Sequence, residues 1–97
     1  MRVISVKTVR DFWEKHRDAE PMLRAWYDEA VAAQWQTPQD ILGRYRSADI
    51  LSDNRVVFNI KGNTYRLVVK LNFEKQWIFI RFIGTHEEYD KIDANTI

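Results

Sequence analysis

The chain contains no cysteine among its 97 residues and only two histidines. The absence of cysteine excludes a disulfide scaffold, a cysteine-ligated zinc or iron–sulfur site and a thiol nucleophile. Two histidines are too few for a His-rich metal centre, so neither a metal nor any other cofactor is expected.

Apolar runs long enough to cross a membrane are also absent. No stretch approaches the ~18 residues of a membrane span, and residues 1–7 lack the apolar core of a signal peptide. We therefore expect a cytoplasmic protein without membrane contact. A length of 97 residues, with 45% hydrophobic and 13% aromatic composition, predicts one globular domain that covers residues 1–97.

The net charge of +1 conceals an uneven distribution of charge along the chain. Residues 44–81 carry eight basic and three acidic side chains, whereas residues 1–43 and 82–97 are each net negative. Such a concentration of positive charge in one segment favours a polyanionic partner such as nucleic acid.

Apolar residues in the first half of the chain recur at helical spacing. Val9 and Trp13 share one helical face, and Leu23, Trp26 and Ala30 share another. Ser5, Asp18 and Thr37 are each placed to cap a helix, which predicts helices ending near His16, Trp35 and Gly43, while residues 2–4 predict a short strand.

From Arg55 onward apolar residues alternate with polar ones, which is the period of a half-buried strand. Turn residues at 61–63 and 74–76 divide this region into three consecutive strands of an antiparallel meander. The run Thr85-His86-Glu87-Glu88 is a capping box and predicts a short C-terminal helix that carries Tyr89. The predicted fold class is α+β, with the N-terminal helices packed on one face of the sheet.

Alternation also sorts the strand residues onto the two faces of the sheet. One face is almost wholly apolar and is expected to pack against the helices; it comprises Val56, Phe58, Ile60, Tyr65, Leu67, Val69, Leu71, Ile78, Ile80 and Phe82. The other face mixes cations with aromatic rings; it comprises Arg55, Val57, Asn59, Arg66, Val68, Lys70, Trp77, Phe79 and Arg81.

The second face has no acidic residue among its predicted outward positions to balance its four cations. Phosphate is a natural counter-charge, and Trp77 and Phe79 offer surfaces on which bases can stack. Two other interpretations stay open. The face is either solvated, with long side chains lying over apolar neighbours, or covered by acidic residues from elsewhere in the chain.

Two blocks of the sequence closely resemble the HigB-type toxin family, a group of RelE-like toxins. The first block is NRVVFNIKGNTYRLV at residues 54–68, and the second is IFIRFIGTHEEYDKI at residues 78–92. Shorter stretches at 10–16, 23–27 and 47–49 fit the same pattern, so the resemblance extends over nearly the whole chain.

The resemblance implies a RelE-like fold, with helices on one face of an antiparallel sheet and the opposite face open. It implies the toxin of a type II toxin–antitoxin pair, an endoribonuclease (mRNA interferase) that cuts mRNA in the ribosomal A site and inhibits translation. The cut needs no metal, because the ribose 2′-OH attacks the adjacent phosphate. The implied partners are mRNA, the ribosome and a HigA-type helix-turn-helix antitoxin, with operator DNA bound only through the antitoxin complex.

Positions that match the family's motifs give the catalytic candidates Arg66, Arg81, His86 and Tyr89. The arginines are expected to stabilise the phosphorane, and His86 or Tyr89 to transfer protons. Histidine is the residue type whose unperturbed pKa, about 6.5, lies nearest neutral pH. The RNA-binding candidates are Arg44, Arg46, Arg55, Lys61, Lys70, Trp77 and Phe79.

Two other functions would use the same basic face. A non-catalytic RNA- or ribosome-binding module would stall translation without cutting mRNA, so mapping of mRNA 5′ ends separates it from a nuclease. A protein-interaction domain would dock an acidic partner instead, and salt-sensitive co-sedimentation with ribosomes would argue against that function.

Overall fold

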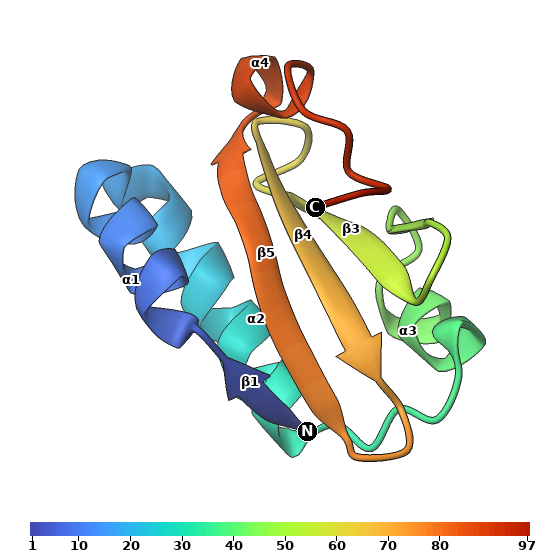
Figure 1. Ribbon diagram of the computed structural model, residues 1–97. Helices are drawn as coiled ribbons and strands as arrows, with labels where there is room; N and C mark the ends of the chain where they lie inside the picture. Colours follow the sequence, from blue (N-terminus) through green and yellow to red (C-terminus); the bar gives the residue numbers. More distant parts are fainter.

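The computed structural model describes residues 1–97 and contains one five-stranded sheet with strand order β1-β5-β4-β3-β2. In Figure 1 helix α2 passes behind the sheet, α1 lies to the left of β5, and the C-terminal segment crosses in front of the sheet. The predicted α+β class is confirmed. The elements are β1 (Arg2–Ile4), α1 (Val6–Lys15), a 3-10 turn (Arg17–Ala19), α2 (Glu20–Ala32), α3 (Pro38–Arg44), β2 (Asp49–Ile50), β3 (Arg55–Ile60), β4 (Tyr65–Asn72), β5 (Trp77–Thr85) and α4 (His86–Tyr89).

The sheet is mixed rather than wholly antiparallel. Strands β3, β4 and β5 form the predicted antiparallel meander. The short N-terminal strand β1 runs parallel to β5, with Arg2 opposite Trp77 and Ile4 opposite Phe79. Along the chain, α1 and α2 follow β1 before any other strand, which gives the connection the length that a parallel neighbour requires. The two-residue strand β2 adds the other edge and was not predicted.

A β-bulge in β5 reverses the expected alternation near the end of the strand. Val69 pairs with Ile80 but Val68 pairs with Phe82, so Arg81 is an extra residue in the ladder. The prediction that Phe82 faces the helices is therefore wrong. Phe82 packs with Val68 on the opposite face, because a one-residue shift moves every later side chain to the other side.

The main core lies between the helices and the predicted apolar face. Val9, Leu23 and Ala30 have no exposed surface. The indole of Trp26 packs edge-on against Phe58, with ring centroids 5.5 Å apart. Burial of each large apolar side chain stabilises the fold by about 1.5–3 kcal/mol, so this layer fixes the helices behind the sheet.

The helix starts agree only in part with the predicted caps. Ser5 precedes α1 but has a left-handed backbone (φ 70°), and its side chain caps nothing. Asp18 lies within the 3-10 turn and instead accepts hydrogen bonds from the Tyr65 hydroxyl and the Lys61 ammonium at 2.6 and 2.7 Å. At α3 the Asp40 carboxylate accepts a hydrogen bond from the Thr37 N–H at 3.1 Å, so the helix begins where the sequence predicted.

The second helix is shorter than predicted. It ends at Ala32, three residues before Trp35. None of the helices combines the length and apolar content that a membrane crossing would require.

Candidate active site

Arg66 and Tyr89 meet where the sheet ends against α4. The Arg66 guanidinium carbon lies 5.8 Å from the centroid of the Tyr89 ring. Asn63, in the β3–β4 turn, accepts two hydrogen bonds from the guanidinium, at 2.6 Å on its side-chain oxygen and 3.3 Å on its carbonyl. Arg66 is only 8% exposed. Its charge is thus fixed in position by a turn and a ring, with no acidic partner.

The bulge in β5 provides the support beneath Tyr89. Phe82 now lies on the open face, and its ring centroid is 6.4 Å from that of Tyr89. Gly84, opposite Arg66 in the ladder, leaves room for the Phe82 ring. A Cβ atom at Gly84 would lie 2.6 Å from Cζ of Phe82, closer than real Cβ contacts allow.

His86 begins α4 and lies one helical turn before Tyr89. The capping box is confirmed: the Thr85 N–H donates to Glu88 at 2.8 Å, and the Glu88 N–H donates to the Thr85 hydroxyl at 3.2 Å. Nδ1 of His86 lies 3.1 Å from an Asp90 carboxylate oxygen. The imidazole is nearly half exposed.

Burial raises the pKa of the Tyr89 phenol above its ordinary value of 10.0, and the negative charge of Asp49 adds to this effect. The nearby Arg66 charge acts in the opposite direction but is the weaker cause. Tyr89 therefore keeps its proton at neutral pH. It can donate that proton, but it cannot serve as a base there.

Arg81, the second predicted arginine, is the extra residue of the bulge. It lies between Ile80, whose side chain is in the main core, and Phe82, whose side chain is on the open face. Arg81 is exposed and forms no ion pair. Arg81 lies three positions before Gly84, which places it ~10 Å along the strand from the position opposite Arg66.

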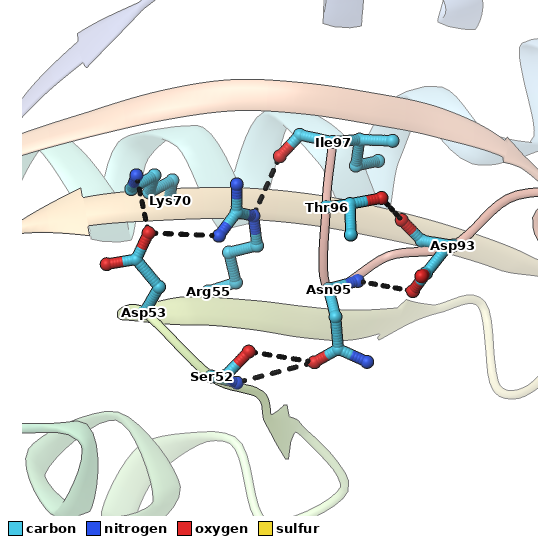
Figure 2. Close-up of polar contacts among 8 residues, drawn as sticks. All are labelled: Ser52, Asp53, Arg55, Lys70, Asp93, Asn95, Thr96 and Ile97. Carbon is cyan, nitrogen blue, oxygen red and sulfur yellow. Dashed lines mark hydrogen bonds and ion pairs between the residues drawn. The ribbon is translucent and has the colours of Figure 1, made fainter.

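The other cations of β3 and β4 are not free. Asp53, in the loop before β3, lies 3.2 Å from the Arg55 guanidinium and 2.8 Å from the Lys70 ammonium (Figure 2). The Arg55 Nε–H also donates to the carbonyl of Ile97 at 2.7 Å. Arg55 is buried, at 8% exposure. For these two cations the structure therefore bears out the interpretation that acidic residues from elsewhere in the chain cover the face.

The C-terminal segment covers the same half of the face. Ala94 packs against Val57 and Val68 in a small second core, which Phe82 and Tyr89 border. Asn95 accepts hydrogen bonds from Ser52 (Figure 2). The C-terminal segment therefore covers the part of the open face that β3 and β4 form. The uncovered part of this face lies along β5 and β1.

The remaining cations lie elsewhere. Arg44 pairs with Glu29 and Lys61 pairs with Asp18, so both lie at the border between the sheet and the helices. Arg46 is exposed and pairs with no acid. None of the three lies on a strand of the open face.

Trp77 and Phe79 lie at the start of β5, far from α4 along the strand. Their ring centroids are 5.9 Å apart and nearly perpendicular, and the Lys75 ammonium lies 4.8 Å from the Trp77 ring. Both aromatic residues are half-buried. They therefore form a separate cluster from Arg66 and Tyr89.

Sequence reasoning missed Asn63, Asp53 and Gly84. Asn63 carried a usable signal, because a turn amide three residues before an arginine can reach its side chain. Asp53 lies outside the strands, where alternation gives no information. No three His, Asp or Glu side chains lie close enough together to hold a metal ion.

Comparison with known proteins agrees with the two sequence blocks. A family model described as HigB_toxin, RelE-like toxic component of a toxin-antitoxin system, matches residues 19–92. The mRNA interferase toxin HigB of Escherichia coli (strain K12) is 32% identical over 96 residues, covering 97% of this chain and 92% of that protein. The mRNA interferase HigB of Shigella flexneri matches equally. The mRNA interferase HigB of Escherichia coli O6:H1 is 23% identical over 94 residues, covering 95% of this chain and 91% of that protein.

Proposed function

This chain belongs to the HigB family of RelE-like toxins, and from that premise we propose that it is the toxin of a toxin–antitoxin pair and cleaves mRNA. The observation that carries the proposal is the buried Arg66 guanidinium against the Tyr89 ring, one helical turn from His86. Relatives that align over nearly their full length are named mRNA interferases, which supports an endoribonuclease.

The proposed reaction is a metal-independent attack of the ribose on its own phosphate. The 2′-oxygen bonds to phosphorus and loses its proton to a base, while the bond from phosphorus to O5′ breaks and O5′ takes a proton from an acid. The products are a 2′,3′-cyclic phosphate and a 5′-hydroxyl end. Negative charge on the non-bridging oxygens rises in the transition state, so a fixed cation accelerates the step.

The geometry supports a role for each member of this group. Arg66 supplies the fixed cation, because Asn63 and the Tyr89 ring already hold its guanidinium in place. Tyr89 is the acid, since its raised pKa keeps it protonated at neutral pH. His86 is the base, with Asp90 beside Nδ1 orienting the ring and Nε2 left to accept the proton.

The other candidate residues are proposed to bind RNA outside the reacting phosphate. Arg81 is exposed and has no acidic partner, so it can bind a phosphate next to the cut or assist Arg66. Lys70 and Arg55 would release the Asp53 carboxylate and bind an RNA phosphate in its place. Trp77 and Phe79 would stack bases, and Arg44, Arg46 and Lys61 would follow RNA or ribosomal RNA backbone beyond the sheet.

The proposal includes the partners that the family implies. We propose that a HigA-type helix-turn-helix antitoxin neutralises the chain and binds operator DNA for the complex. We further propose that cleavage occurs in the cytoplasm on mRNA held in the ribosomal A site.

The test is expression of single variants in cells that lack the antitoxin. Tyr89→Phe and His86→Ala are expected to relieve growth arrest and reduce new mRNA 5′ ends by about 100-fold or more, because each removes one proton transfer. Arg66→Lys keeps the charge but loses the paired donors, so partial activity is expected. Arg10→Ala, on α1, is the matched control and should remain toxic.

The readouts separate the alternatives. Each variant must still co-purify with the antitoxin, which shows that it is folded. Codon-phased mRNA ends made equally by wild type, Tyr89→Phe and His86→Ala would refute the site. Growth arrest without any new ends would indicate a non-catalytic ribosome-binding module.

A further inference from the structure

A strip of cations and aromatic rings follows the half of the open face that the C-terminal segment leaves uncovered. It comprises Arg2, Ile4, Lys75, Trp77, Phe79 and Arg81, and we call it the β1–β5 strip. In Figure 1 the C-terminal segment ends in front of β3 and β4, while β1 and the first half of β5 have no segment in front of them.

The parallel pairing of β1 assembles this strip. Arg2 lies beside Trp77 in the ladder, and Ile4 lies beside Phe79, so all four side chains project from one face. Val3, between them, packs into the main core on the other side. Without β1 the two rings would lie at the edge of the sheet.

The strip is positive and has no internal counter-charge. Arg2, Lys75 and Arg81 are exposed, none forms an ion pair with an acid, and no strip residue is acidic. Lys70, the neighbour of Phe79 on β4, already pairs with Asp53. The uncompensated charge is therefore at the β1 and β5 side of the face.

We propose that the β1–β5 strip binds a single-stranded segment of the mRNA substrate outside the cleavage site. Bases would stack on Trp77 and Phe79, and Arg2 and Lys75 would bind the adjoining phosphates. Arg81 lies between the strip's rings and the Arg66–Tyr89 group, so one strand can contact both. This inference rests on the proposed function and extends the same substrate along the sheet.

The spacing along β5 sets the length of RNA required. Trp77 lies seven residues before Gly84, which is ~23 Å at about 3.3 Å per residue. Even fully stacked, at about 3.4 Å per nucleotide, an RNA of about twelve nucleotides spans this distance from Tyr89, whereas a dinucleotide is too short to do so.

Fluorescence anisotropy of the purified chain with labelled 2′-O-methyl RNA tests the inference, because such RNA lacks the attacking hydroxyl and is not cut. Trp77→Ala is expected to weaken binding of the twelve-nucleotide RNA between about 5-fold and about 150-fold. Binding of the dinucleotide should not change. Trp77→Phe keeps a stacking surface and should restore most of the affinity.

Charge on the strip is tested with a matched pair of variants. Arg2→Ala should lower the slope of log affinity against log salt by ~0.7 for the twelve-nucleotide RNA. Arg10→Ala removes the same charge from the helical side of the molecule and should leave the slope unchanged. Equal unfolding midpoints in urea for Trp77→Ala, Arg2→Ala and wild type show that the variants are folded.

Three outcomes would overturn the inference. The first is equal affinity for the long RNA in Trp77→Ala, Arg2→Ala and Arg10→Ala. The second is loss of ribosome co-sedimentation with long-RNA binding intact, which points to ribosomal RNA. The third is loss of antitoxin binding alone, which points to a protein partner. None of these outcomes tests the proposed nuclease activity, because cleavage of mRNA by the wild type measures that activity separately.

Discussion

Gly84 is the position at which one methyl group tests both the fold and the candidate site. An added Cβ would lie 2.6 Å from Cζ of Phe82, 3.1 Å from Cε1 of the same ring and 3.1 Å from a Glu88 carboxylate oxygen. The Glu88 side chain could move only by giving up its hydrogen bond from the Thr85 N–H, and the Phe82 ring lies under Tyr89. Gly84→Ala must therefore displace that ring.

We expect Gly84→Ala to lower the free energy of unfolding by about 1–3 kcal/mol, the usual cost of overpacking. Urea unfolding followed by tryptophan fluorescence measures it. Gly43→Ala is the matched control, because nothing lies within 4 Å of its added Cβ in α3. There alanine should raise the free energy of unfolding by about 0.5–1 kcal/mol, so the two changes have opposite signs.

The same variant should reduce mRNA cleavage, because Tyr89 loses its support. Phe82→Leu shortens the group that meets the new methyl, so the double variant should be less destabilised than the two single changes added together. If Gly84→Ala is as stable and as active as Gly43→Ala, then the close contact with Phe82 does not position Tyr89.

Two further predictions concern the covered half of the open face. Hydrogen bonding to Lys70 and the charges of Lys70 and Arg55 hold the pKa of Asp53 below its ordinary 3.8. A carboxyl with a lowered pKa stabilises the fold above that ordinary value, and the stabilisation is lost as pH falls through the folded value, so urea unfolding below about pH 4 should show a steeper loss for wild type than for Asp53→Asn. Ala94→Asp places a charge against Val57 and Val68 and should cost about 1–3 kcal/mol in the same assay, whereas exposed Thr96→Asp should cost little.

The sequence predicted the sheet well where alternation and turn residues agreed. The β3–β4 hairpin and the capping box at Thr85 follow from local chemistry, because turn and cap residues act within a few positions. The bulge at Arg81 had no such signal. Phe82 and Ile83 are both apolar, so alternation permits either of them to face the helices.

The sequence predicted which residues belong to the candidate site better than it predicted the contacts that these residues make. Arg66, His86 and Tyr89 are found at one end of the sheet, but the partners of Arg55 and Lys70 come from a loop and a terminal segment that carry no periodic pattern. Electrostatic compensation of this kind depends on tertiary placement, which a single sequence does not encode locally. Caps also failed where a residue found a stronger distant partner, as Asp18 does with Tyr65.

The pairing of Arg2 with Trp77 joins the first strand to the last, and this has a consequence for synthesis. Strand β1 leaves the translating ribosome before β5 has been synthesised. It can therefore pair with β5 only after α1, α2 and α3 have also emerged. Contacts this distant in sequence form late in folding. A nascent chain therefore has neither the β1–β5 pairing nor the contact between Arg66 and Tyr89 until residues through α4 have emerged.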